Sequence, residues 1–215
     1  MCEPNYYQTF HRDRDYRSEV DQVLEVLGPA ESIADFGDGC GRHLELIAEA
    51  GHRVVEVDAL ADTGGTVDAA IMMSSLGDQV TNQRILRTLA APSRRLRPGG
   101  LLLFDVIDGE AVLGAPVPLR GLKVLDDPGS RLLCGYTGDV LTEEQVYRLT
   151  LRMWRLDGDR VTDRAEETHH IRYFLPRELR LLLSLGGFEL VGTAPLAGQR
   201  DPATAWLRLG WARKA

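Results

Sequence analysis

Residues 31–58, ESIADFGDGCGRHLELIAEAGHRVVEVD, decide the fold of this chain. Their pattern predicts a short apolar strand over residues 31–36, a turn with glycine at every second position, and a helix over residues 42–50. A second strand follows over residues 52–57 and ends at Asp58. This order of elements is that of an open α/β sheet, in which ligands bind beyond the carboxyl ends of the strands.

The turn between the first strand and the helix suits the close approach of a ligand. Its glycines Gly37, Gly39 and Gly41 let the backbone turn sharply and leave room beside it. The helix that follows presents unpaired N–H groups in its first turn. The carboxylate of Asp58 can accept hydrogen bonds from the two hydroxyls of a ribose. The alternative is a glycine-rich connection that holds no ligand.

The pattern D-x-G-x-G-x-G, which begins at Asp35, resembles the first motif of class I S-adenosylmethionine (SAM) dependent methyltransferases. It differs from the G-x-G-x-x-G fingerprint of dinucleotide-binding proteins. Two later stretches are similar to those of small-molecule members of this family, RRLRPGGLLLFDVID at residues 94–108 and HHIRYFLPRELRLLLSLGGFELV at residues 169–191. The resemblance covers residues 6–213 and implies SAM as the cofactor. It implies cofactor contacts from Asp35, Gly37, Asp38, Gly39, Gly41, Asp58 and Ser74.

The remaining segments predict the other elements of such a fold. Helices are expected over residues 15–27, 78–96 and 176–186, buried strands over residues 67–73 and 101–107, and a closing strand pair over residues 187–209. A sharp turn is expected at residues 97–100, where the sequence is RPGG. From residue 120 to residue 173 apolar and polar side chains alternate, which predicts an antiparallel meander with one packed face and one polar face.

We therefore expect one α/β domain with the Rossmann-like class I methyltransferase fold. Its sheet is mostly parallel with an antiparallel final strand, and the antiparallel β meander is inserted after the fifth core strand. Along the chain, an N-terminal helical cap (residues 1–30) precedes the nucleotide-binding core (residues 31–108). The β insertion that caps the substrate (residues 109–173) and a C-terminal helix with the closing strands (residues 174–215) complete the domain.

One part of the expected fold does not fit into the chain. Only nine residues, 59–67, lie between Asp58 and Asp68, whereas a crossover that contains a helix needs at least about 10–12 residues. The third edge strand and its helix are therefore predicted to be missing. A nearly straight link can still reach a parallel strand, because nine residues span at most about 30 Å. In the alternative, residues 61–66 form a hairpin loop, and the strand at residues 67–73 is antiparallel.

The shortened link bears on the cofactor as well as on the fold. The missing strand would supply a wall and a polar partner to the adenine ring. Each unsatisfied buried group costs about 1–3 kcal/mol, which corresponds to SAM binding that is about tenfold to a hundredfold weaker.

Composition narrows the class of protein. A chain of 215 residues with 44% hydrophobic residues suits one domain with a substantial core. Its net charge of −7 argues against nucleic acid or an anionic membrane as the partner. There is no apolar run of membrane-spanning length and no signal-like N-terminus. Three cysteines that are far apart favour a reduced, cytoplasmic protein. A small molecule is the expected substrate, and a homodimer is left open.

The candidate catalytic residues lie near the end of the predicted meander. Methyl transfer needs alignment of the reactants and, for many acceptors, a general base. Neighbouring residues on a strand point to opposite faces, so only one of His169 and His170 can face the substrate. We predict His169, with Tyr173 beside it; an exposed strand histidine is the alternative. We expect Arg172 to pair with the acids at residues 166–167. The other pocket residues predicted to contact substrate are Tyr7, His11 and Asp108. No histidine or cysteine spacing predicts a metal site.

The leading hypothesis is SAM-dependent methyl transfer to an O or N atom of a small molecule. A second hypothesis is a methyltransferase-fold protein that no longer methylates and instead catalyses a cyclisation, elimination or rearrangement, or binds a ligand. A third is a subunit that supports an active methyltransferase, which predicts an exposed apolar edge where the third strand would lie.

Overall fold

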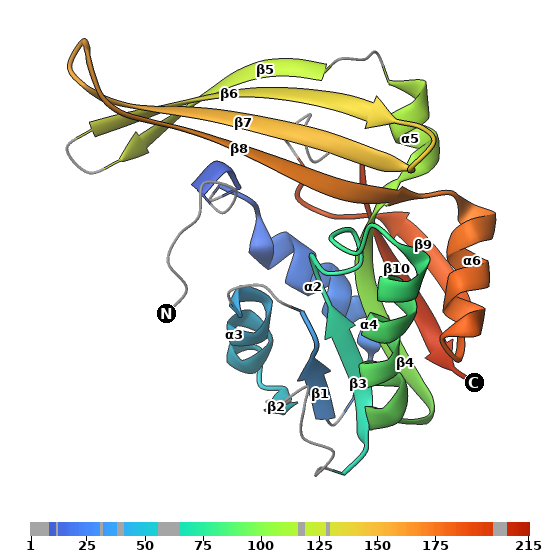
Figure 1. Ribbon diagram of the computed structural model, residues 1–215. Helices are drawn as coiled ribbons and strands as arrows, with labels where there is room; N and C mark the ends of the chain where they lie inside the picture. The colour runs from blue at the N-terminus through green and yellow to red at the C-terminus, as the bar shows by residue number, and fades with distance from the viewer. Residues whose placement is uncertain are drawn as a thin grey trace.

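The computed structural model describes residues 9–11, 13–30, 32–37, 41–55, 65–115, 119–127, 130–199 and 206–215. A core sheet flanked by helices carries a four-stranded antiparallel meander above one end (Figure 1). No helix in the described part of the chain is long and apolar enough to span a membrane.

The core sheet has the strand order β2-β1-β3-β4-β10-β9. Its strands are β1 (Ser32–Asp35), β2 (Arg53–Val55), β3 (Val67–Met72), β4 (Leu96–Asp108), β9 (Phe188–Pro195) and β10 (Leu207–Lys214). The first four strands are parallel, and β10 runs antiparallel between β4 and β9. The predicted mostly parallel sheet with an antiparallel final strand is confirmed.

Strand β3 settles the question left by the short link. It pairs in parallel with β1 on one side and with β4 on the other, so the alternative hairpin at residues 61–66 is wrong. The apolar run explains this central position, because a strand between two helix layers must be apolar on both faces. The described residues place no strand on the outer side of β2, where a third strand was predicted to be missing.

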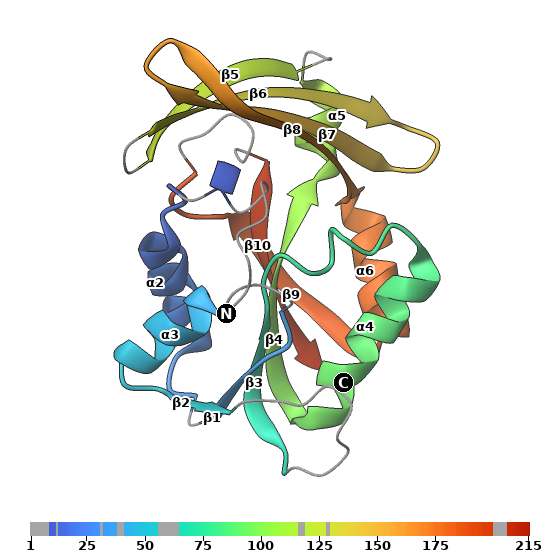
Figure 2. The same cartoon turned by 60° about the vertical axis from the view of Figure 1, so that its left-hand side comes forward.

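Helices cover both faces of the core sheet (Figure 2). Helices α2 (Tyr16–Leu27) and α3 (Arg42–Glu49) lie on one face, and α4 (Asn82–Arg95) and α6 (Pro176–Leu185) on the other. Alternate residues of β3 fill the two layers: Ile71 packs with the α2 and α3 side, and Met72 with the α4 and α6 side. The helices begin at side-chain caps where the sequence supplies them, since Asp15 accepts from the Ser18 N–H and Thr81 from the Arg84 N–H.

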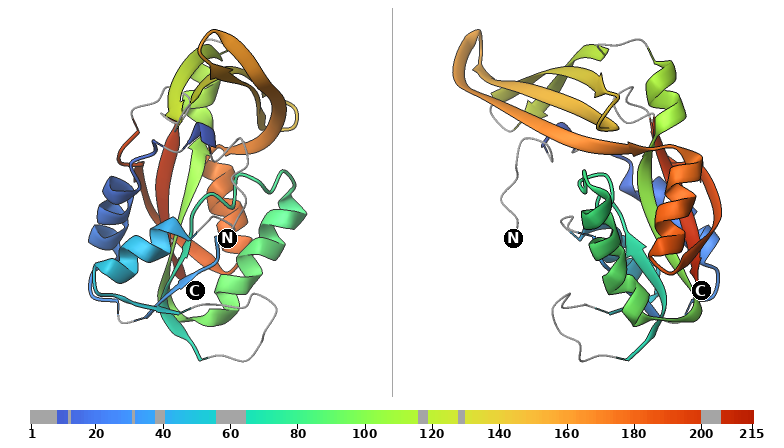
Figure 3. Two further views of the ribbon diagram at one scale, coloured as in Figure 1. Left: turned by 90° about the vertical axis from the view of Figure 1, so that its left-hand side faces the viewer. Right: turned by 45° about the vertical axis from the view of Figure 1, so that its right-hand side comes forward.

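The predicted meander is confirmed, and it consists of β5 (Leu119–Asp127), β6 (Ser130–Leu141), β7 (Val146–Asp157) and β8 (Arg160–Phe174). The end of β8 pairs in parallel with the end of β4, through Ile107 and Tyr173. The far ends of the meander strands extend away from the core (Figure 3). Its inner face carries the buried side chains of β7, including Leu149 and Leu151, which belong to the same cluster as Ile107 of the core.

Two local expectations need correction, and one element was not expected. The sharp turn predicted at residues 97–100 lies inside β4, where Gly99 has a φ of +75° and the pairing with β3 shifts register. The helix predicted from residue 78 begins at Asn82, because Thr81 is its cap. A short helix, α5 (Gly109–Gly114), connects β4 to the meander and was not predicted.

Candidate active site

We use the word crevice for the region beyond the carboxyl ends of β1 and β3, where an open α/β sheet binds its ligands. At the end of β1 this region contains a turn in which a side chain at position 37 would collide with neighbouring backbone. The Asp35 carboxylate accepts a hydrogen bond of 2.7 Å from the Gly37 N–H. A Cβ atom added to Gly37 would lie 2.9 Å from the Met73 carbonyl oxygen and 3.0 Å from Asp35 Oδ1. Helix α3 starts nearby after Gly41, which has a φ of +72° and gives the helix no side-chain cap. The glycine at position 37 therefore lets the turn pass close to the end of β3, and contact of this turn with a ligand stays a prediction.

The neighbouring strand end places Ser74 in the same crevice. Ser74 has a φ of 56°, which is uncommon for a residue with a side chain. Its N–H donates to Asp105 Oδ1 at 2.5 Å, and this charged acceptor holds the unfavourable backbone conformation in place. Asp105 interrupts the apolar run of β4 and is itself buried.

An arginine from the N-terminal segment completes the crevice. Arg14 Nη1 donates to Ser74 Oγ at 3.2 Å, and Nη2 to Asp105 Oδ2 at 3.2 Å. Arg14 Nε donates to Glu19 at 2.5 Å, and Glu19 Oε2 lies 2.8 Å from His43 Nε2. We call Arg14, Glu19, His43, Ser74 and Asp105 the crevice network. It joins α2, α3, β4 and the loop after β3.

Burial and ion pairing act in opposite directions on the pKa values of Glu19 and Arg14 in the crevice network. Burial by itself would raise the pKa of Glu19, but the hydrogen bonds from His43 and Arg14 outweigh it and lower the pKa below the usual 4.5. Burial would likewise lower the pKa of the Arg14 guanidinium, but the negative charges of Asp105 and Glu19 raise it instead. Both side chains therefore stay ionised at neutral pH.

The lowered pKa of Glu19 predicts a pH dependence of stability. The contribution of Glu19 is fully present above its unfolded pKa and is lost as the pH falls through the lower folded pKa. At pH 7 we expect Glu19→Gln to reduce the free energy of unfolding by about 1–3 kcal/mol, and the difference from the parent protein to shrink as the pH falls below 4.5. Urea unfolding of both proteins at several pH values measures this difference in the free energy of unfolding. Glu49→Gln is the control, because Glu49 is 64% exposed; equal acid profiles for the two variants would contradict the prediction.

The structure brings some of the predicted cofactor residues together and leaves others outside the description. Asp35, Gly37, Gly41 and Ser74 line or flank the crevice. Asp38, Gly39, Asp58 and Tyr7 lie outside the described residues. Sequence reasoning missed Arg14, Glu19, His43 and Asp105. The acid inside the apolar run at residues 101–107 was the one signal that could have suggested this network.

Two predicted substrate residues have evident structural partners. Asp108 Oδ1 accepts from the N–H groups of Glu110 and Ala111 and so caps α5, and its Oδ2 lies 3.3 Å from Arg208 Nη1. His11 is buried beside Phe10, with 4.9 Å between the ring centroids. Their contact with substrate stays a prediction.

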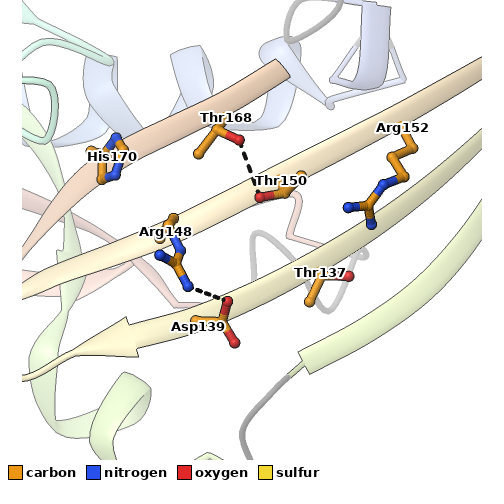
Figure 4. Close-up of a pocket in the computed structure, with 7 residues that line it drawn as sticks. All are labelled: Thr137, Asp139, Arg148, Thr150, Arg152, Thr168 and His170. Atoms are coloured by element: carbon orange, nitrogen blue, oxygen red, sulfur yellow. Dashed lines mark hydrogen bonds and ion pairs between the residues drawn. The ribbon is translucent and has the colours of Figure 1, made fainter. Parts of the chain in front are cut away.

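The two histidines of β8 point to opposite faces of the meander. His169 stands opposite Leu149 in the register of β7 and β8 and therefore shares the inner face. Its Nε2 lies 3.1 Å from Glu167 Oε2, and both side chains are partly exposed. His170 stands opposite Arg148 and lines a hollow of about 430 Å³ on the outer face (Figure 4).

The two other residues predicted near His169 are both buried. Tyr173 packs with Ile107, Leu149 and Leu151 in one buried cluster, which we call the inner-face cluster. Burial and the charge of Glu178 raise the pKa of Tyr173. Arg172 pairs with Glu178 of α6 and donates to the Val80 carbonyl at 3.0 Å, so the pairing expected with residues 166–167 is wrong. The described residues hold no group of three or more His, Cys, Asp or Glu side chains that could bind a metal ion.

Comparison with known proteins identifies the fold. No protein-family model matches the chain, and no curated protein matches its sequence. CalS10, a SAM-bound amino pentose methyltransferase from Micromonospora echinaspora, is 18% identical, with a TM-score of 0.73 over 100% of this chain and 99% of CalS10. The chain has the class I methyltransferase fold.

Other solved structures agree with this assignment. The sugar N-methyltransferase KedS8 from a Streptoalloteichus species is 20% identical, with a TM-score of 0.73 over 100% of this chain and 95% of KedS8. DesVI from Streptomyces venezuelae is 18% identical, with a TM-score of 0.71 over 97% of this chain and 99% of DesVI. The methyltransferase fold thus spans the core sheet and the meander together.

Proposed function

We propose that this chain transfers a methyl group from SAM to an O or N atom of a small molecule. The observation that carries the proposal is the fold that the whole chain shares with methyltransferases such as CalS10 and KedS8, together with the glycine turn at the carboxyl end of β1. In a protein with the methyltransferase fold, such a turn at the carboxyl end of β1 suits close contact between the backbone and a nucleoside ligand. Two of the similar structures were solved with SAM bound, which supports the same cofactor here.

The chain's own residues would bind and orient the reactants. The turn at Gly37 and the first turn of α3 would hold the polar end of the cofactor. Bound SAM would supply an electrophilic methyl group. His169 would take the proton from the acceptor atom as the new bond to carbon forms and the sulfonium bond breaks.

The meander would cover the acceptor. Its inner face is largely apolar around Leu149 and Leu151, and the pair of His169 and Glu167 adds polar groups. This composition suits an organic molecule that carries a few polar atoms. CalS10 and KedS8 act on an amino pentose and on a sugar nitrogen, which favours an amine nitrogen as the acceptor.

Titration with S-adenosylhomocysteine, the demethylated product of SAM, tests the proposal. Isothermal titration calorimetry should give binding in the micromolar range. An absence of binding at millimolar ligand would overturn the proposed function. It would instead favour a methyltransferase-fold protein with another activity, the alternative that the nine-residue link between Asp58 and Asp68 suggests.

The same titration with the Gly37→Ala protein tests whether the ligand binds at this turn. The added methyl group would displace the Met73 carbonyl or the turn itself, because the distance of 2.9 Å is shorter than van der Waals contact. We expect the dissociation constant for S-adenosylhomocysteine to rise by about tenfold or more. Gly114→Ala is the matched control, since an added Cβ meets nothing within 4 Å there. Equal affinities in the two variants would argue against binding at this turn.

The described part of β2 gives no support to a partner-subunit role. Arg53 is exposed, whereas Val54 and Val55 are partly buried against the core. The described residues of this edge, 53–55, therefore show no exposed apolar surface of the kind that such a role predicts.

A further inference from the structure

The N-terminal segment, residues 9–11 and 13–15, lies between the meander and the core sheet (Figure 1). We call it the strap. Phe10 of the strap is fully buried in the inner-face cluster of the meander, with its ring 5.5 Å from that of Tyr136. At its other end, Asp15 caps α2. The strap is therefore packed against both parts of the molecule.

A single lysine fastens the strap to the meander. Lys123 of β5 donates from Nζ to the Phe10 carbonyl at 3.0 Å and to Asp13 Oδ1 at 2.5 Å. The same ammonium lies 5.1 Å from the centre of the Phe10 ring. A lysine suits this place because its three donors on a flexible stem can serve a carbonyl, a carboxylate and a ring together. The chain contains just one other lysine, Lys214, among 25 basic residues.

The residue after Asp13 reaches into the crevice. Arg14 donates to Ser74 and Asp105 at the ends of β3 and β4. Consecutive residues of the strap thus hold the meander and the crevice network. Asp13 and Arg14 are adjacent in the chain, so a movement of the strap backbone away from Lys123 would also displace Arg14.

We propose that Lys123 is a positioning residue that fixes the strap across the crevice and so controls the release of the methyl donor. The attachment of the strap stands on the contacts alone, whereas its effect on the donor rests on the proposed function. The Lys123–Asp13 pair is the part that opens first. Asp13 is 57% exposed, and ion pairs open to solvent are weak, whereas Phe10 and Arg14 are held in buried surroundings.

Lysine acylation tests the attachment without any cofactor. The native protein is treated with an acetylating N-hydroxysuccinimide ester, and mass spectrometry follows the modification of Lys123 relative to Lys214. Lys214 is the internal reference, because it donates to the Leu96 carbonyl at the opposite end of β4. Asp13→Asn should speed modification of Lys123 by about twofold to fivefold, the scale of a lost exposed ion pair.

Asp126→Asn is the matched control for this experiment. Asp126 also lies on β5 and is 95% exposed, and its ion pair with Arg131 is long, at 3.8 Å. Its replacement should leave the rate at Lys123 unchanged. Equal rates in the Asp13→Asn and Asp126→Asn variants would overturn the attachment.

A binding experiment tests the effect on the donor. Lys123→Met should raise the dissociation constant for S-adenosylhomocysteine by about fivefold to tenfold, while Lys214→Met leaves it unchanged. In turnover, the KM for SAM should rise with little change in kcat, because Lys123 acts through the strap. Bound S-adenosylhomocysteine should also slow acylation of Lys123 but not of Lys214.

The outcomes separate the two proposals. If the ligand binds the parent protein and Lys123→Met equally well, the control of donor release is wrong. If it binds neither, the proposed function fails and the control of donor release fails with it. The acylation rates then still decide whether Lys123 holds the strap.

Discussion

Replacing His169 by glutamine should lower kcat for methyl transfer by about a hundredfold to ten-thousandfold, the usual contribution of a positioned general base. The reason is the register of β8. His169 shares the inner face with Leu149, which packs toward the core, whereas its neighbour His170 shares the outer face with Arg148. His170→Gln should therefore leave kcat unchanged. The two variants differ by one position on one strand, so general damage to the meander would affect both.

The measurement is the rate at which S-adenosylhomocysteine forms from SAM in the presence of an acceptor. Aminosugars and simple amines form the panel from which the acceptor is chosen. Glu167→Gln adds a finer test, because Glu167 is within 3.1 Å of the His169 ring and would orient it. We expect this variant to lose about tenfold in kcat. Similar rates for His169→Gln and His170→Gln would show that the base lies elsewhere or that none is needed.

The buried strands and the meander were accessible from sequence because their signals are local. The apolar run at residues 67–73 predicted a buried strand, and β3 is central in the sheet. The alternation from residue 120 to residue 173 predicted the meander. Glycines at alternate positions predicted a sharp turn, and the close approach of the Met73 carbonyl explains the glycine at position 37. Each of these inferences needs only the period of the chain and the usual geometry of a strand.

Residues that acquire their role from distant partners were not accessible. Arg14 and Asp105 are 91 positions apart, and no local pattern links them. Glu19 lies next to the apolar face of α2, and it is buried because Arg14 and His43 hydrogen-bond to its carboxylate. A distant partner also explains why the ion pair predicted for Arg172 was wrong. Arg172 was assigned to the nearest acids along the strand, but the fold brings it to Glu178 on the following helix.

Asp108 illustrates a third kind of ambiguity. An acid that ends a parallel strand can serve a ligand or cap the next helix, and both uses favour the same residue type at the same place. The capped helix α5 has only six residues, too few to show a helical period in the sequence. The hydrogen bonds to Glu110 and Ala111 establish the cap, and a role toward substrate would have to come in addition.

Arg14→Met is expected to reduce the free energy of unfolding by about 3–5 kcal/mol, the usual cost of removing one partner from a buried ion pair. Methionine keeps much of the apolar stem but leaves Glu19 and Asp105, which are 2% and 3% exposed, without their shared cation. The free energy of unfolding of Arg14→Lys should lie between those of the parent protein and Arg14→Met. An ammonium keeps the charge but cannot reach all the acceptors of the planar guanidinium. Urea unfolding at pH 7 measures all three proteins.

Arg17→Met supplies the comparison for this prediction. Arg17 is close to Arg14 in sequence and also pairs with a glutamate, but it is 70% exposed and Glu49 is 64% exposed. Its replacement should cost about 0–1 kcal/mol. If Arg14→Met proves as mild as Arg17→Met, the crevice network does not hold the N-terminal segment against the core. The crevice would then depend on the Gly37 turn and Asp105 alone, and the strap could leave without exposing an unpaired charge.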